Sequence, residues 1–129
     1  MSGYTIKNLK DVQDSAPKFG MQGVEARFAS GDLELEKSGL SYQRLDPGVR
    51  IPFGHTQKQQ EEVYVVLGGS GRVKLDDEIV DIGAHDVVRV DSSVMRGFAG
   101  GPDGVEILAF GAPHTGPGDA EMQQDWWTD

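Results

Sequence analysis

Short runs in which apolar residues alternate with other residues recur along this chain, and glycine or proline usually separates one run from the next. In the run 24–29, Val24, Ala26 and Phe28 alternate with Glu25 and Arg27. A period of two is typical of a β-strand with one buried face. Further strands are predicted at 40–45, 63–67, 71–75, 79–82, 86–90, 94–99 and 105–110. Turn signals at about eight- to twelve-residue spacing predict an all-β sandwich or barrel, and barrel closure removes exposed sheet edges.

Four other segments receive predictions from local patterns. Residues 4–9 form a possible edge strand, and residues 33–37 suit either a strand or a short amphipathic helix. The glycine-rich stretch 68–71 is interpreted as a tight hairpin turn between two strands. Near the end of the chain, Asp119 is a suitable N-cap for a short helix over 120–127. Trp126 and Trp127 are expected to pack on the barrel or on a second subunit, because their rings are costly to leave in water.

Length and charge restrict the possible classes of protein. The 129 residues suit one domain, 1–129, with a barrel core at about 24–110 and a tail at 111–129. The 12 basic and 21 acidic residues give a formal charge of −9, which argues against nucleic acid as a partner. The absence of cysteine excludes disulfides and thiolate chemistry. No secretory-type leader and no apolar run near about twenty residues is seen, so a cytoplasmic protein without a membrane partner is expected.

The segment 47–73 contains an unusually dense group of polar residues. Its sequence, PGVRIPFGHTQKQQEEVYVVLGGSGRV, predicts a strand ending near Phe53, a polar corner from His55 to Glu62, and an apolar strand over 63–67. The corner contains one histidine, three glutamines and two glutamates, which is an unusual density for a plain connection.

This segment resembles the first motif of the cupin superfamily. Gly48 opens the motif, His55 stands for its first histidine, Glu62 for its glutamate and Gly69 for its closing glycine. Gln57 occupies the position of the second histidine, and the spacing from Gly48 to His55 is one residue longer than usual.

The segment 83–98 is similar to the second cupin motif in the pattern of its strands, but it lacks the metal-binding histidine of that motif. Asp91 stands at the proline position, Ser93 at the glycine position and Arg96 at the histidine position. The resemblance covers about 40–110. It implies a cupin β-barrel of jelly-roll type, similar to small single-domain bacterial cupin proteins that commonly form homodimers.

In metal-binding cupins, two histidines and a glutamate from the first motif and a histidine from the second surround a transition metal. Here His55 and Glu62 remain as good ligands, whereas the amide of Gln57 is a weak ligand and the guanidinium of Arg96 brings a fixed positive charge. We therefore expect no cofactor and no tightly bound divalent transition metal. Arg96 is predicted to pair with Glu62 in place of the ion. If a metal does bind, the resemblance implies His55, Gln57 and Glu62 as its ligands.

The resemblance also implies a polar cavity inside the barrel. Its predicted lining, which would bind a small anionic or sugar-like molecule, is His55, Gln57, Glu62, Arg96, Tyr64, Phe53 and Phe98. Arg89 alternates with two valines and is expected to point outward, and His85 and His114 are expected at the surface.

Two other functions stay open at this point. One is an enzyme of the dioxygenase or isomerase and epimerase type, which would use His55 and Glu62 with a metal. A metal-free version would use His55 as general base and Glu62 to orient it. The other is a homodimeric regulatory or assembly module. Whether the chain is an enzyme is not decided by its sequence.

Overall fold

The structure is a computed structural model that describes residues 3–57, 61–112, 120–124 and 126–127, without the side chains of residues 57 and 120. Two short 3-10 helices precede the strands: η1 (Leu9–Asp11) and η2 (Ala16–Phe19). The strands are β1 (Val24–Phe28), β2 (Gly39–Leu45), β3 (Gly54–Gln57), β4 (Glu62–Leu75), β5 (Glu78–Gly83), β6 (Val87–Val90), β7 (Arg96–Gly111) and β8 (Ala120–Gln123). None of the described helices is long and apolar enough to cross a membrane.

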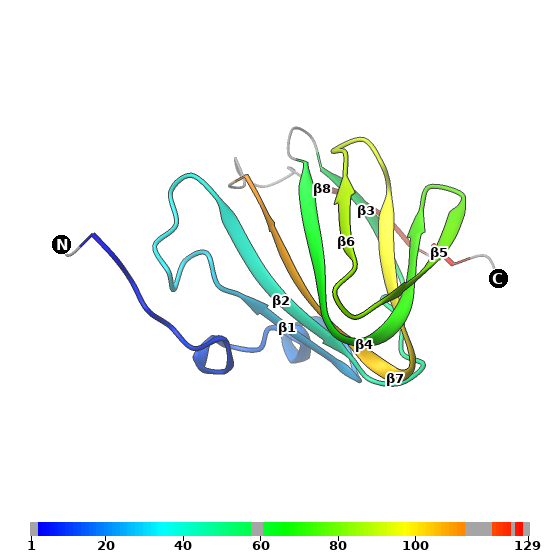
Figure 1. Ribbon diagram of the computed structural model, residues 1–129, viewed down its shortest axis with the longest axis horizontal. Helices are drawn as coiled ribbons and strands as arrows, with labels where there is room; N and C mark the ends of the chain where they lie inside the picture. The colour runs from blue at the N-terminus through cyan, green and yellow to red at the C-terminus, as the bar shows by residue number, and fades with distance from the viewer. Residues whose placement is uncertain (1–2, 58–60, 113–119, 125, 128–129) are drawn as a thin grey trace.

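The strands form one curled antiparallel sheet built around β4 and β7 (Figure 1). One path through the sheet runs β1-β2-β7-β3-β8, and β4 pairs with β5, β6 and β7. The two long strands pair from Glu62 opposite Gly111 to Leu75 opposite Arg96, with register shifts between Val66 and Gly71. The all-β barrel predicted from the alternating runs is confirmed.

The glycine-rich stretch 68–71 does not form the predicted hairpin turn. β4 continues through it and bends, and β7 bends beside it through its own glycines. A Cβ at Gly69 would lie 2.2 Å from the carbonyl oxygen of Gly104, and a Cβ at Gly71 would lie 2.3 Å from that of Ala99. These glycines therefore allow two backbones to approach closely. The hairpin lies further on, where Asp76 and Asp77 join β4 to β5.

Alternation along β4 decides which side chains enter the barrel. Glu62, Tyr64 and Val66 share the interior face, and the intervening valines face outward. The apolar core, which includes residues from β2 and β4 to β7, consists of Leu45, Ile51, Tyr64, Val66, Val73, Ile82, Val90, Phe98, Val105, Ile107 and Ala109. The period-two pattern thus predicted the inward face of the central strand correctly.

Two N-terminal predictions are wrong. Residues 4–8 form no strand, and Tyr4 and Ile6 are exposed. The edge of β1 is instead approached by Asp14, which forms an isolated bridge with Arg27. Residues 33–37 form neither strand nor helix. They make successive turns, in which backbone N–H groups of 33–35 donate to carbonyl oxygens of 29–31.

The strand predicted before the polar corner begins later than expected. Residues 47–53 contribute only an isolated bridge between Arg50 and Ala99. Regular pairing starts at Gly54, so His55 and Gln57 lie in β3 rather than in a connection. This shift places two positions of the first motif on a strand.

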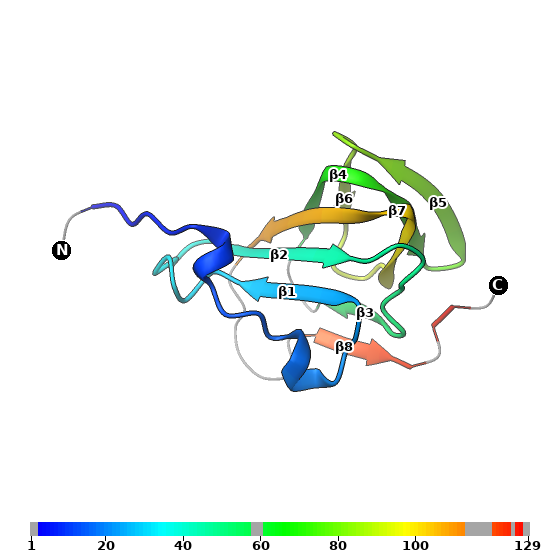
Figure 2. The ribbon, with the colours of Figure 1, turned by 90° about the horizontal axis from the view of Figure 1, so that it is seen from below.

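The predicted C-terminal helix is also wrong where the structure describes it. Ala120–Gln123 forms β8, which pairs with β3 (Figure 2). The open edge of β3 offers backbone hydrogen-bonding groups, and pairing with them outweighs the weak local preference for a helix. Asp119, the predicted cap, lies outside the described residues. Trp126 is buried against the barrel, as expected.

Candidate functional site

Four of the predicted site residues come together inside the barrel. His55 lies on β3, Glu62 and Tyr64 lie on β4, and Arg96 begins β7. His55 stands directly opposite Arg96 in the ladder between β3 and β7, so their side chains leave the same face of the sheet. Glu62 approaches them across the interior from β4.

One carboxylate oxygen is the centre of the site. The hydroxyl of Tyr64 donates a hydrogen bond to Oε1 of Glu62. Nε2 of His55 lies 3.8 Å from the same oxygen, and Nη1 of Arg96 lies 3.9 Å from it. The side chains of His55 and Glu62 are 25% and 18% exposed, whereas that of Arg96 is 0% exposed. Solvent therefore reaches the histidine and the carboxylate but not the guanidinium.

A backbone carbonyl group holds the guanidinium of Arg96 in place. Its Nη2 donates to the carbonyl oxygen of Asp91 at 2.8 Å. Nε and Nη1 are buried and have no hydrogen-bond partner in the described part of the chain. Glu62 is thus the nearby negative charge that balances a completely buried cation. Sequence reasoning missed the contribution of Asp91, because a backbone carbonyl leaves no signature in side-chain identity.

The surroundings determine the ionisation states of Glu62 and Tyr64, which both lie on β4. Burial raises the pKa of Glu62, but the neighbouring His55, the Tyr64 hydroxyl and Arg96 outweigh it, so the pKa falls below its ordinary value. Burial, reinforced by the negative charge of Glu62, raises the pKa of Tyr64 well above its ordinary value. At neutral pH, Glu62 is therefore an ionised acceptor and Tyr64 a protonated donor.

The aromatic candidates form the wall behind this centre. The rings of Tyr64 and Phe98 lie 4.7 Å apart between centroids, tilted by 56°. Phe98 is buried, and the half-buried Phe53 packs against the core. The backbone of Gln57 lies in β3, but its side chain is outside the described part, so its role stays a prediction.

Comparisons with known proteins agree on this architecture. A cupin protein from Bacteroides fragilis superimposes with a TM-score of 0.73 at 22% identity, covering 89% of this chain and 88% of that one. The polyketide cyclase RemF from Streptomyces resistomycificus gives a TM-score of 0.75 at 18% identity, covering 97% of this chain and 87% of that one. This chain has the cupin fold. No protein-family model matches it, and no curated protein matches it either.

Oxalate decarboxylase from Bacillus subtilis has the same cupin fold in a longer chain. Its TM-score is 0.72 at 23% identity, and the match covers 93% of this chain but only 32% of the decarboxylase. The present chain therefore spans about a third of that enzyme. At these identities the likeness concerns the fold.

Among the described residues, the donor set of this cupin-fold chain does not fit a transition metal. In this part of the chain, no group of three or more His, Cys, Asp and Glu side chains lies close enough to hold an ion. The carboxylate oxygen of Glu62 is already contacted by the hydroxyl of Tyr64 and approached by the guanidinium of Arg96. A guanidinium has no lone pair to offer and repels a cation.

Two of the remaining candidates, Arg89 and His85, lie on the outside of the barrel. Arg89 is 60% exposed and pairs with Glu61 and Asp91, which confirms its predicted outward direction. His85 is exposed, also as predicted. His114 lies outside the described residues.

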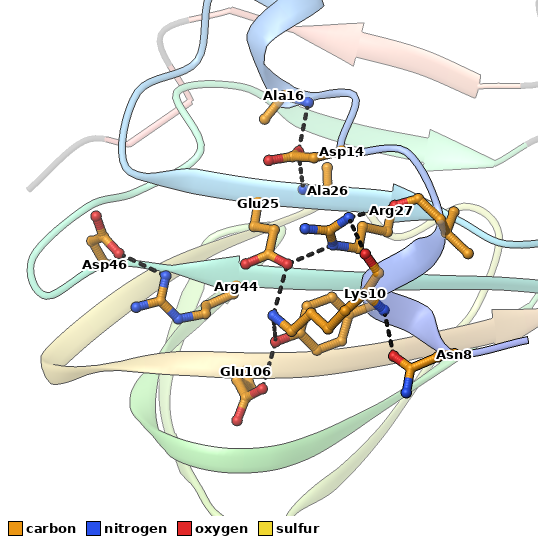
Figure 3. Close-up of polar contacts among 12 residues, drawn as sticks. Asn8, Lys10, Asp14, Ala16, Glu25, Ala26, Arg27, Arg44, Asp46 and Glu106 are labelled. Carbon is orange, nitrogen blue, oxygen red and sulfur yellow. Dashed lines mark hydrogen bonds and ion pairs between the residues drawn. The ribbon is translucent and has the colours of Figure 1, made fainter.

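A second polar cluster fastens the N-terminal segment to the outer face of β1 and β2 (Figure 3). Oε2 of Glu25 accepts from Lys10 at 2.8 Å and from Arg27 at 2.5 Å. The hydroxyl of Tyr42 donates a hydrogen bond to the carboxylate of Glu106. Nζ of Lys10 lies 4.9 Å from the centroid of the Tyr42 ring. These groups satisfy one another, so we interpret the cluster as structural.

Proposed function

We propose that this cupin-fold protein binds a small polar molecule at His55 and Glu62, without a resident transition metal. The observation that carries the proposal is the convergence of Tyr64, His55 and Arg96 on one oxygen of Glu62. The convergence holds an ionised carboxylate in a fixed position while its side chain is still partly exposed. Such preorganised polar groups in an apolar wall are typical of small-molecule sites.

The charge balance favours a neutral, hydroxylated ligand, such as a sugar-like molecule, over an anion. The positive charge of Arg96 is already offset by Glu62, 3.9 Å away. Arg96 is also fully buried, so a ligand carboxylate would have to displace packed groups to reach it. Glu62 is an acceptor for ligand hydroxyl groups, and the partly exposed His55 offers a second polar contact.

A metal-free acid–base enzyme is the second candidate. The hydrogen bond from Tyr64 to Glu62, with His55 on the same carboxylate oxygen, resembles the arrangement in which one group orients a general base. Two of the structural neighbours are named as enzymes, a cyclase and a decarboxylase. In this candidate, His55 would accept a proton from the bound molecule and Glu62 would stabilise the resulting imidazolium.

Thermal-shift measurements with wild type and Glu62→Gln test the proposed function. The panel contains neutral sugars, polyols and small carboxylates at equal concentrations. We expect at least one neutral sugar or polyol to raise the melting temperature of wild type and of the outer-surface control Arg89→Met, but not of Glu62→Gln. A ligand that stabilises Glu62→Gln equally would place binding elsewhere, and a response to carboxylates alone would contradict the ligand class. Incubating each stabilising compound with wild type and His55→Gln then separates binding from turnover.

Elemental analysis of the same preparation tests the metal-free part of the proposal. Purification without added ions is expected to leave less than one equivalent of Fe, Mn, Ni, Cu or Zn per chain. Replacing both Gln57 and Arg96 by His restores imidazole ligands, so the double variant should bind these ions much more tightly. About one equivalent in wild type, or no gain in the double variant, would contradict this assignment.

A further inference from the structure

β8 lies along β3, the strand that carries His55 (Figure 2). We call β8 together with Trp126 the C-terminal strap. In the described part of the chain, β3 pairs with β7 only where His55 faces Arg96. It pairs with β8 along its whole length, from Gly54 opposite Gln123 to Gln57 opposite Ala120. The strap therefore supplies most of the regular pairing that β3 makes.

Trp126 packs on the two glycines that adjoin the paired site residues. A Cβ at Gly54 would lie 2.6 Å from its indole ring, and a Cβ at Gly97 would lie 2.9 Å from it. Gly54 precedes His55, and Gly97 follows Arg96. The indole thus covers the outer side of the sheet at the point where the side chains of His55 and Arg96 enter the interior.

Further contacts hold Trp126 in this place. Its backbone N–H donates to the carbonyl oxygen of Pro52 at 3.2 Å. Its own carbonyl oxygen accepts from Nζ of the buried Lys74 at 2.6 Å, and this Nζ lies 4.1 Å from the indole centroid. A cation over an indole is attracted to the ring face. Trp126 itself is 6% exposed.

We propose that the C-terminal strap is a positioning element of the site, in which Trp126 holds β3 against β7 and so sets the place of His55 relative to Glu62. In the described part of the chain, the regular pairing between β3 and β7 is one ladder pair, and the next link is the isolated bridge between Arg50 and Ala99. We expect this junction to separate more easily than the long ladder between β4 and β7. The indole on Gly54 and Gly97 spans both strands and closes this weak junction. The effect on geometry needs no ligand, whereas its consequence for binding rests on the proposed function.

Amide hydrogen exchange followed by NMR, on ligand-free protein, tests the positioning role. The compared variants are wild type, Trp126→Phe, Trp126→Ala and the control Trp127→Phe. Trp127 is suitable because it contacts the neighbouring segment, donating from Nε1 to the carbonyl oxygen of Ile51 at 2.8 Å. Trp126→Ala is expected to accelerate exchange of the β3 amides at least about tenfold more than that of the β4–β5 amides. Trp126→Phe should show a smaller effect of the same kind, and it keeps the test available if the alanine variant does not fold.

Gly54→Ala tests the same contact from the other side. Its new Cβ would overlap the indole, so the variant should accelerate β3 exchange as Trp126→Ala does. In the double variant the Cβ occupies vacated space, and the two effects should not add. The ring resonances of His55 should shift in Trp126→Ala and in Gly54→Ala, while those of the exposed His85 stay constant.

Equal acceleration in β3 and β4–β5 would show that Trp126 contributes only to global stability, and would overturn the proposal. Unchanged exchange in Gly54→Ala would overturn it as well. Neither result depends on the thermal-shift panel, so a failure of the strap and a failure of the proposed ligand site are distinguishable.

Discussion

Arg96→Met is expected to lower the free energy of unfolding by about 2–4 kcal/mol at neutral pH. The substitution removes the cation that balances Glu62 and leaves the carbonyl oxygen of Asp91 without its donor. Methionine fills much of the space, so the loss reports on charge and hydrogen bonding more than on a cavity. Urea unfolding of wild type and variant measures the change. Arg89→Met is the matched control, and its effect should stay within about 0.5 kcal/mol because Arg89 is exposed.

A double-mutant cycle with Glu62→Gln separates the pair from its surroundings. Glu62→Gln removes the negative charge but keeps a side chain that accepts from Tyr64. Adding it to Arg96→Met should recover part of the loss, because no unpaired carboxylate then remains beside the interior. Strictly additive losses would show that the two charges do not stabilise each other, and the idea that Arg96 takes the place of an ion would fail.

Gly71→Ala is expected to cost about 3 kcal/mol, near the upper end of the usual range for overpacking. Its added Cβ would lie 2.3 Å from the carbonyl oxygen of Ala99, and this oxygen belongs to the backbone of β7. A flexible side chain could move away, but here a paired strand has to shift. Gly83→Ala, where nothing lies within 4 Å of the new Cβ, is the control.

Urea unfolding of both variants tests the interpretation of the bend between β4 and β7. We expect Gly83→Ala to change stability by no more than about 0.5 kcal/mol. Similar small losses at both positions would mean that the close approach of β4 and β7 at this bend is not required.

The interior face of the barrel was predictable because strand alternation is a local property. Glu62 and Tyr64 point inward and Arg89 points outward, as the period of two requires. The glycine stretch at 68–71 was misinterpreted because a glycine needed for a turn and a glycine needed for a close backbone approach look the same in sequence. Only the position of Ala99 and Gly104 on β7 distinguishes the two cases.

The ends of the chain were not predictable for a different reason. β8 pairs with the edge of β3, and the position of this edge is set by the tertiary structure and not by the sequence of residues 120–123. Likewise, the burial of Trp126 depends on the glycines at 54 and 97, which lie far from it in sequence. Local helix propensity carries no information about either partner.

The proximity of His55, Glu62 and Arg96 was predictable, but the geometry of their contacts was not. The cupin resemblance placed His55, Glu62 and Arg96 together, and the structure brings them around one oxygen. The resemblance did not indicate that Arg96 would be fully buried while His55 and Glu62 stay partly exposed. In the function that we propose, Arg96 would therefore support Glu62 rather than contact the ligand directly.

The lowered pKa of Glu62 also links the site to stability. Because the folded pKa lies below the unfolded one, its contribution is fully present above the unfolded value of about 4.3. The contribution is lost as the pH falls through the folded pKa. Glu62→Gln should therefore show a weaker loss of stability between neutral and acidic pH than wild type.

The central claim is that Glu62 is held ionised by Tyr64, His55 and Arg96, and a carboxyl-carbon NMR titration of Glu62 tests it most directly. Glu62→Gln identifies the resonance, and wild type is then titrated from neutral pH downward over the range in which it remains folded. We expect a pKa below the ordinary value of about 4.3 in wild type, and a higher pKa in Arg96→Met. A wild-type pKa at or above the ordinary value, unchanged by Arg96→Met, would contradict this account of the site.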